Sequence, residues 1–233
     1  MYNFIGENVN DIGAGDMQDI YALIVFGKEH KGTFVDLGCR HPILHNNTYL
    51  LEQYGWKGIA VDFDDYTKEW LESRPNSKYF NKDVFELDFK KEFDDFGFSE
   101  TIDFLSIDLD KPGSRFLSLR NILLESGREF KTITIEHDSY RSDNIIFEQL
   151  PQRELLSSLG YVLVKDCDVI EDFWINPKYI NKDQYEILIH KNETRDYGHA
   201  IGATIRPYEH LMKKGYDWTH FYEINNLSVH STY

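Results

Sequence analysis

The sequence predicts an α/β fold in which a mostly parallel central sheet carries helices on both faces. Short apolar segments of strand length alternate along the chain with longer segments of helical periodicity. Several of the apolar segments end on an acidic residue, as strands do where their carboxyl ends border a ligand site. The chain has 233 residues, 41% of them hydrophobic, which suits one such domain with additions, or at most two small domains.

The first half of the chain is expected to form a leading helix and two strand–helix units. DMQDIYALIVFGKEH (16–30) has the pattern of an amphipathic helix that begins at an Asp cap. GTFVDLG (32–38) and KGIAVD (57–62) are short and apolar enough to be buried strands. Residues 46–55, with an Asn cap and a Gly stop, and residues 65–74 are the helices that follow them.

The second half of the chain continues this alternation. Strands are expected at 102–108 and 131–136, with a helix at 114–126 between them. Residues 143–160 are expected to be helical with a break near Pro151, because proline removes a helical hydrogen bond. Two late strands, YVLVKD and YEILIH, are expected at 161–166 and 185–190.

The pattern fades after residue 190. Residues 191–233 are rich in Tyr, His and Trp and have little aliphatic periodicity. We therefore expect one domain over residues 1–190 and an aromatic C-terminal extension, 191–233, that packs on it.

Composition restricts the classes of function. The formal net charge of −15 disfavours tight binding to nucleic acid phosphates, and no local basic patch stands out. Two cysteines make no disulfide framework and a CxxC motif is absent, so a reduced, cytoplasmic setting is expected. The longest strongly apolar run, residues 20–26, is far too short to span a bilayer. The oligomeric state stays open.

The segment FVDLG (34–38) predicts a cofactor-binding turn. Gly38 lets the backbone turn tightly and approach a ligand, and the following helix aims its free N–H groups at that turn. Asp36 can accept a hydrogen bond from an amine, and Asp62, at the end of the next strand, can grip two vicinal ribose hydroxyls. Neither GxGxxG nor GxxxxGK[ST] is present, which argues against a pyrophosphate cradle. The alternative is an ordinary strand–turn–helix corner that binds nothing.

A set of motifs resembles the FkbM-like family of S-adenosylmethionine-dependent methyltransferases. In the order of that family, the chain has FVDLG (34–38), HP (41–42), NTYLLE (47–52), GWKGIAVD (55–62), IDFLSID (102–108), TITIEH (132–137) and GYVLVKDCDVIEDFWINP (160–177). The resemblance covers roughly residues 15 to 180. It implies a Rossmann-like class I methyltransferase fold, with S-adenosylmethionine (SAM) as the cofactor.

The resemblance also implies which residues contact the cofactor. Asp62 would bind the ribose, and Asp83 with Val84 would lie at the adenine edge; the alternative for these acids is a solvated position in an acidic loop. The family's Asp-x-Glu-Gly after the fourth strand is DLDKPG here, so the acid survives as Asp110 but the glycine moves to Gly113. The other implied cofactor contacts, with the turn facing the methionine part, are Asp36, Gly38, Cys39, His41 and Asn47.

Methyl transfer to a hydroxyl requires alignment of the two groups and removal of the hydroxyl proton. His137, between Glu136 and Asp138 at a strand end, is the candidate general base, and Asp108 is the second candidate catalytic residue. The alternative for His137 is a structural role. A bound Mg²⁺ or Mn²⁺ would also acidify the hydroxyl, and the candidate metal ligands are Asp108, Asp110, His137 and Asp138. The alternative is an acidic cluster that caps helices and binds no metal.

The sequence thus predicts a SAM-dependent O-methyltransferase that acts on a hydroxyl of a sugar or glycan. EDFWINP (171–177) and the aromatic tail are expected to form a wall over this acceptor, unless they cover the core or form a dimer contact. Two alternatives are open. One is a methyltransferase that acts on a polyketide or another small molecule, and the other is an inactive module that binds a cofactor or a glycan.

Overall fold

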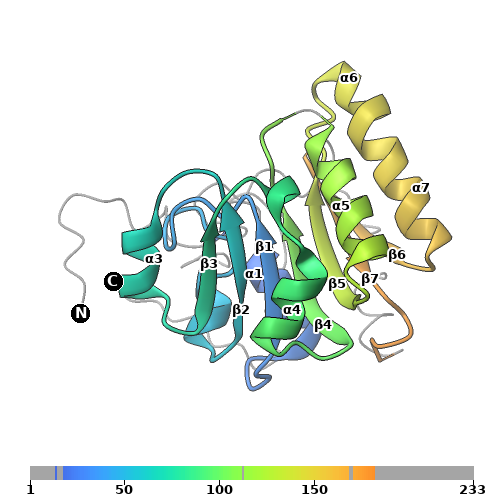
Figure 1. The fold of residues 1–233 in the computed structure, drawn as a ribbon. Helices are drawn as coiled ribbons and strands as arrows, with labels where there is room; N and C mark the ends of the chain where they lie inside the picture. The colour runs from blue at the N-terminus through green and yellow to red at the C-terminus, as the bar shows by residue number, and fades with distance from the viewer. Residues whose placement is uncertain (1–13, 15–17, 112, 168–169, 182–233) are drawn as a thin grey trace, which may run out of the picture.

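The computed structural model describes residues 14, 18–111, 113–167 and 170–181 (Figure 1). The described elements are, in chain order, α1 (Gln18–Phe26), β1 (Thr33–Leu37), α2 (Tyr49–Gln53), β2 (Lys57–Asp62), α3 (Thr67–Ser73), β3 (Ser77–Asn81), η2 (Val84–Glu86), α4 (Phe89–Phe96), β4 (Thr101–Ile107), α5 (Ser114–Glu125), β5 (Glu129–Glu136), α6 (Ser142–Asn144), η3 (Ile145–Gln149), α7 (Leu150–Ser158), β6 (Val162–Cys167) and β7 (Glu171–Ile175). The segment η2 is a 3₁₀-helix and η3 is a π-helix.

The strands form one seven-stranded sheet in the order β3-β2-β1-β4-β5-β7-β6. All pairs from β3 to β5 are parallel, and β7 alone runs antiparallel to both of its neighbours. The chain moves outward from β1 to β3 and then returns to place β4 on the other side of β1, so the strand order reverses between β1 and β4. This is the Rossmann-like class I methyltransferase fold, which confirms the predicted fold class.

Alternate residues of the central strands bury opposite faces of the sheet. Phe34 of β1 and Phe104 of β4 pack with α1 and with Leu51 of α2. The next residues in the same strands, Val35 and Leu105, pack in a second cluster with side chains of α4, α5 and α7. The helices therefore cover both faces of the sheet, with α4 and α5 in front and α1 behind in the view of Figure 1.

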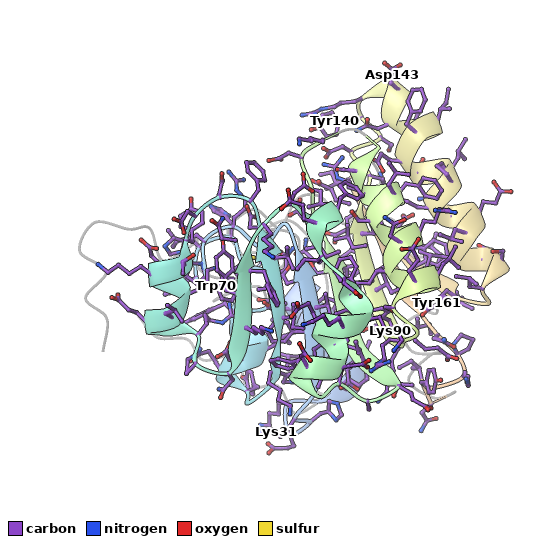
Figure 2. The ribbon with its side chains drawn as sticks, in the orientation of Figure 1. Lys31, Trp70, Lys90, Tyr140, Asp143 and Tyr161 are labelled. Atoms are coloured by element: carbon purple, nitrogen blue, oxygen red, sulfur yellow. The ribbon has the colours of Figure 1, made fainter. Side chains whose placement is uncertain are left out.

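The parallel pairing aligns the carboxyl ends of the central strands. Leu37, the last residue of β1, is paired with Val61 of β2 and with Ile107 of β4, so the residues that follow these strands share one edge of the sheet. Figure 2 shows the two edges, with Lys31, just before β1, at the bottom and Tyr140, which follows β5, at the top. The cofactor turn and the acidic strand ends are therefore all expected at the top edge.

A buried acid ties three strands together at the opposite edge. Asp103, near the start of β4, accepts hydrogen bonds from Thr33 N at 2.8 Å and Lys131 Nζ at 2.7 Å, and His30 Nε2 lies 3.3 Å from its carboxylate. Burial acts to raise the pKa of Asp103, but these hydrogen bonds and the Lys131 charge lower it to about 2. The carboxylate thus joins β1, β4 and β5 away from the cofactor turn.

Three elements were not predicted as such. The strand β3, SKYFN, is short and has no fully buried residue, and the helix α4, FKKEFDDF, is short and highly charged. The strand β7, EDFWI, is buried over its whole length, so residues 171–175 belong to the core, which was the stated alternative to a wall over the acceptor. The irregularity predicted near Pro151 is present as the π-helix η3, which ends two residues before Pro151, but the chain stays helical on both sides of it, from Ser142 to Ser158.

The predicted strand at 185–190 and the predicted extension at 191–233 lie outside the described residues. Among the residues that are described, no helix is long and apolar enough to cross a membrane.

Candidate functional site

A cleft of about 650 Å³, part of it open to solvent, lies at the carboxyl ends of β1, β2, β3 and β4. Its position agrees with the rule that open α/β sheets bind ligands where the strand order reverses. The lining residues are Gly38, Arg40, Asp62, Phe63, Asp64, Lys82, Asp83, Val84, Phe85, Asp108, Leu109, Asp110, Lys111 and Ser114.

Gly38 forms the floor of the turn after β1. Its φ of +83° lies in the left-handed region, and its N–H donates to the carbonyl of Val61 at 2.9 Å. A Cβ at this position would lie only 1.9 Å from the backbone carbonyl oxygen of Asp108. The glycine is therefore required by the close approach of two strand ends, in addition to any approach of a ligand.

Asp62 holds the second strand end in place. Its Oδ2 accepts from the Arg40 N–H at 2.8 Å, and its Oδ1 accepts from the Asp64 N–H at 2.9 Å. Burial raises the pKa of Asp62, and the two backbone hydrogen bonds oppose that shift. Each carboxylate oxygen can accept a further hydrogen bond, so the side chain can receive two hydroxyl groups from the cleft without losing its own support.

The third strand end supplies an apolar surface. Asp83 accepts a hydrogen bond from the Phe85 N–H at 3.1 Å and begins η2, while Val84 is buried in the cleft wall. Phe63 and Phe85 line the same cleft but are 67% and 48% exposed. Two exposed aromatic rings beside a fixed acid are suited to a flat heterocycle, which gains stacking energy from such faces.

The fourth strand end carries a pair of carboxyl groups. Asp108 lines the cleft and interacts with Glu136 of the neighbouring strand end. Burial is the main cause that raises the pKa of both groups, and the charge of Asp108 helps to raise that of Glu136 to about 10. The two carboxyl groups therefore titrate as a pair rather than independently.

The positive charge beside this pair comes from Arg115. Its Nη2 lies 2.9 Å from Asp138 Oδ2 and also contacts the carboxylate of Glu136. Across the described ranges, no group of three or more His, Cys, Asp and Glu side chains is arranged to hold a metal ion. The structure therefore does not support the predicted metal site at Asp108, Asp110, His137 and Asp138. The buried guanidinium of Arg115 already pairs with Asp138, one of the predicted metal ligands, and its charge also acts on Asp108.

His137 lies outside the cleft lining and its side chain has no exposed surface. Its Nδ1 accepts from the Ser139 N–H at 3.3 Å, and its Nε2 lies 3.4 Å from both Asp172 Oδ1 and Gln149 Nε2. Arg153 in turn forms two hydrogen bonds of 2.7 Å with Asp172. The ring thus sits within a buried network that joins the end of β5 to β7 and α7.

Four other predicted contacts also lie outside the cleft lining, and two of them are Asp36, within β1, and Cys39, in the turn after it. Asp36 is fully buried and accepts from Thr48 Oγ1 at 2.9 Å; burial raises its pKa to about 7. Cys39 is also buried, and burial raises the pKa of its thiol well above its usual range.

The remaining two support the same turn through their own hydrogen bonds. Asn47 is buried and donates to Ser106 Oγ at 2.9 Å, which joins the start of α2 to β4. His41 Nδ1 accepts from the N–H groups of Ile43 and Leu44, at 3.2 and 3.1 Å. These residues shape the turn from behind, while Gly38 faces the cleft.

The cleft thus brings together six of the predicted residues, namely Gly38, Asp62, Asp83, Val84, Asp108 and Asp110. Sequence reasoning missed the aromatic pair Phe63 and Phe85 and the basic side chains Arg40, Lys82 and Lys111. Phe63 directly follows Asp62, the acid at the end of β2. A search for aromatic residues directly after strand-end acids would therefore have found Phe63.

Comparison with known proteins agrees with this fold. No protein-family model matches the chain, and no curated protein is similar enough to count as a relative. Among solved structures, the fibrillarin pre-rRNA processing protein of Methanococcus jannaschii is 16% identical, with a TM-score of 0.45 over 73% of this chain and 84% of that one. Human methyltransferase-like protein 13 in complex with S-adenosylhomocysteine (SAH) is 11% identical, with a TM-score of 0.44 over 78% and 94%.

A SAM-dependent methyltransferase from Aquifex aeolicus is 12% identical, with a TM-score of 0.39 over 69% of this chain and 92% of that one. Two of these three neighbours are thus named as methyltransferases, one as SAM-dependent and one in complex with SAH, and at these identities the likeness concerns the fold alone.

These neighbours correct one prediction. The expected sugar or glycan acceptor and the expected lack of a nucleic acid partner are contradicted, since a pre-rRNA processing protein is among the neighbours. The physical reason is that the net charge of −15 is a sum over the chain and does not give the charge at one site. The cleft itself is lined by the cations of Arg40, Lys82 and Lys111 as well as by acids.

Proposed function

We propose that the chain is a SAM-dependent O-methyltransferase of the FkbM-like type. The observation that carries the proposal is the cleft at the carboxyl ends of β1 to β4, with the buried carboxylate of Asp62 in its wall. The strand order and the antiparallel β7 support the same class of fold.

The cleft residues fit the parts of the cofactor in order along the sheet edge. Asp62 would accept hydrogen bonds from the two ribose hydroxyls, because each of its oxygens has a free lone pair beyond the backbone bond it already accepts. Phe63, Val84 and Phe85 would contact the adenine on the side of β3. The methionine part would then point toward Gly38 and the segment after β4.

When bound, SAM supplies a methyl group on a positively charged sulfur, ready for in-line displacement. Asp108 is the predicted catalytic residue that lies in the cleft, and its carboxylate would take the proton of the attacking hydroxyl. Glu136, which interacts with Asp108 at the neighbouring strand end, would hold that side chain in place. For His137, a role as base would require its buried ring to leave the network around Asp172.

Isothermal titration calorimetry with SAH tests the cofactor part of the proposal. We expect binding in the micromolar range, or about −7 to −8 kcal/mol. The absence of any heat of binding at millimolar SAH would refute it.

Transfer is tested by release of SAH from SAM in the presence of candidate acceptors. The panel should contain hydroxyl-bearing small molecules, polyketides among them, and short RNAs. Release with one member would identify the acceptor class. Tight SAH binding without release for any member would support the alternative, a cofactor-binding module without catalysis.

A further inference from the structure

The segment after β4 forms one wall of the cleft, and its conformation depends on a residue far away in the sequence. Leu109, Asp110, Lys111 and Ser114 line the cleft. Gly113 begins α5 with a φ of +82°. No residue of this segment provides a side-chain cap for the helix. The first N–H groups of α5 therefore need an acceptor from elsewhere.

Glu148 of the π-helix η3 is that acceptor. Its side chain is fully buried, and its two oxygens accept from the N–H of Gly113 and, at 2.8 Å, from the N–H of Phe116. Gln152 donates to the same carboxylate at 3.2 Å and to the carbonyl of Glu136 at 3.2 Å. The carboxylate thus joins the start of α5 to α7 and to the end of β5.

The π-helix explains why an acid reaches this position. A π-turn adds one residue to the helical repeat and is common at functional sites. In η3 the preceding residues Ile146 and Phe147 are 66% and 59% exposed, while Glu148 is turned fully inward. A buried carboxylate costs free energy unless it is fully hydrogen-bonded, so its place here depends on the N–H groups it accepts from.

We propose that Glu148 is a positioning residue for the cofactor cleft: it fixes the wall formed by residues 108–111 and 113–114 so that the methionine part of SAM meets a preformed site. This inference rests on the proposed function. Glu148 does not line the cleft, so its effect on binding is exerted through the backbone of this wall. Because the N–H groups of Gly113 and Phe116 already donate to Glu148, they are not free to bind an anionic ligand.

The test compares full-length Glu148→Ala and Glu148→Gln with wild type. The matched control is Glu154→Gln, which removes a charge from an exposed position on α7. Affinity is measured with SAH by calorimetry, and amide hydrogen exchange is followed at Gly113 and Phe116.

In Glu148→Ala, exchange at both amides should speed up at least about tenfold and the Kd for SAH should rise about tenfold, because two buried donors lose their acceptor. Glu148→Gln keeps one acceptor oxygen, so its Kd should rise by a smaller factor, about threefold. The control should stay within about twofold of wild type for both, as is usual for exposed substitutions.

A second readout separates positioning from simple stabilisation. SAH binding should slow exchange across residues 109–116 in wild type and fail to do so in Glu148→Ala, while exchange in the centre of β4 stays equal. A folded Glu148→Ala protein with an SAH affinity within twofold of wild type would overturn the inference. If that variant does not fold, unchanged affinity and exchange in Glu148→Gln would overturn it. Wild-type protein that binds no SAH would refute the proposed function as well, so the two failures are distinguishable.

Discussion

Replacement of Gly38 by alanine isolates the close contact between the ends of β1 and β4. At a φ of +83° an alanine is strained, which costs about 1–2 kcal/mol. The new Cβ would also lie 1.9 Å from the carbonyl oxygen of Asp108, whereas ordinary contacts begin at 3.4 Å. The two strand ends would have to separate by about 1.5 Å, and such overpacking costs about a further 1–3 kcal/mol.

Gly160 provides the matched control. Its φ is +85°, and a Cβ there would meet nothing within 4 Å. Gly160→Ala should therefore lower the free energy of unfolding by the strain alone, about 1–2 kcal/mol, and Gly38→Ala by about 2–5 kcal/mol. Urea unfolding of both variants measures the difference between their free energies of unfolding. The comparison requires that both variants have the same m-value, the slope of that free energy against urea concentration.

Gly38→Ala should also weaken SAH binding about tenfold, because a shift of this size in the cleft floor disturbs the positions of the binding groups. Equal destabilisation by the two substitutions, within about 0.5 kcal/mol, would refute the reasoning from the close contact.

Three further predictions concern single side chains. Asp62→Ala should weaken SAH binding by about 1.5–3 kcal/mol in calorimetry, since charge-assisted hydrogen bonds are lost, while the exposed Asp65→Ala should leave it unchanged; equal affinities would remove Asp62 from the ribose site. His137→Ala should lower the melting temperature by at least about 4 °C and keep SAH affinity within twofold, because the ring is buried away from the cleft; loss of affinity without loss of stability would place His137 in the site. Asp103 has its pKa lowered to about 2 by folding, so its carboxylate adds roughly 1–2 kcal/mol of stability above about pH 4 that is lost as the pH falls through about 2. Asp103→Asn should remove this part of the pH dependence in urea titrations; an unchanged profile would contradict the assignment.

Much of the fold could be predicted from local patterns of apolar and polar residues in the sequence. The strand at Lys57–Asp62 was predicted with its observed bounds. Four apolar or small residues between a charged start and an acidic end are typical of a short buried strand. The strand β7 was missed because EDFWI carries two acids, which sequence rules assign to solvent. These acids are buried because partners from distant elements satisfy them: Asp172 pairs with Arg153, and Glu171 accepts from Gln18 at 2.5 Å.

Site residues at the ends of strands could be predicted from the sequence. Residues whose position depends on contacts between distant elements were harder to predict. Asp62 and Asp83 are placed by strand and loop alone, and both line the cleft. The predicted metal site, which the described residues do not support, is a different case. Nothing in the sequence around Arg115 indicates that its guanidinium lies buried among the acids of two strand ends, because that meeting requires α5 to pack against β4 and β5.

The position of β7 has a consequence for how the chain is made. In the described part of the chain β7 is the last strand, yet it lies between β5 and β6 in the sheet. As the polypeptide leaves the ribosome, β5 has no neighbour on that side until Glu171–Ile175 has emerged, and β6, although synthesised first, cannot join the sheet without it. An unpaired edge with apolar side chains such as Ile133 and Ile135 is prone to pair with other chains. A slow stretch of translation just before residue 171 would therefore prolong the period in which this edge of the nascent sheet stays unpaired.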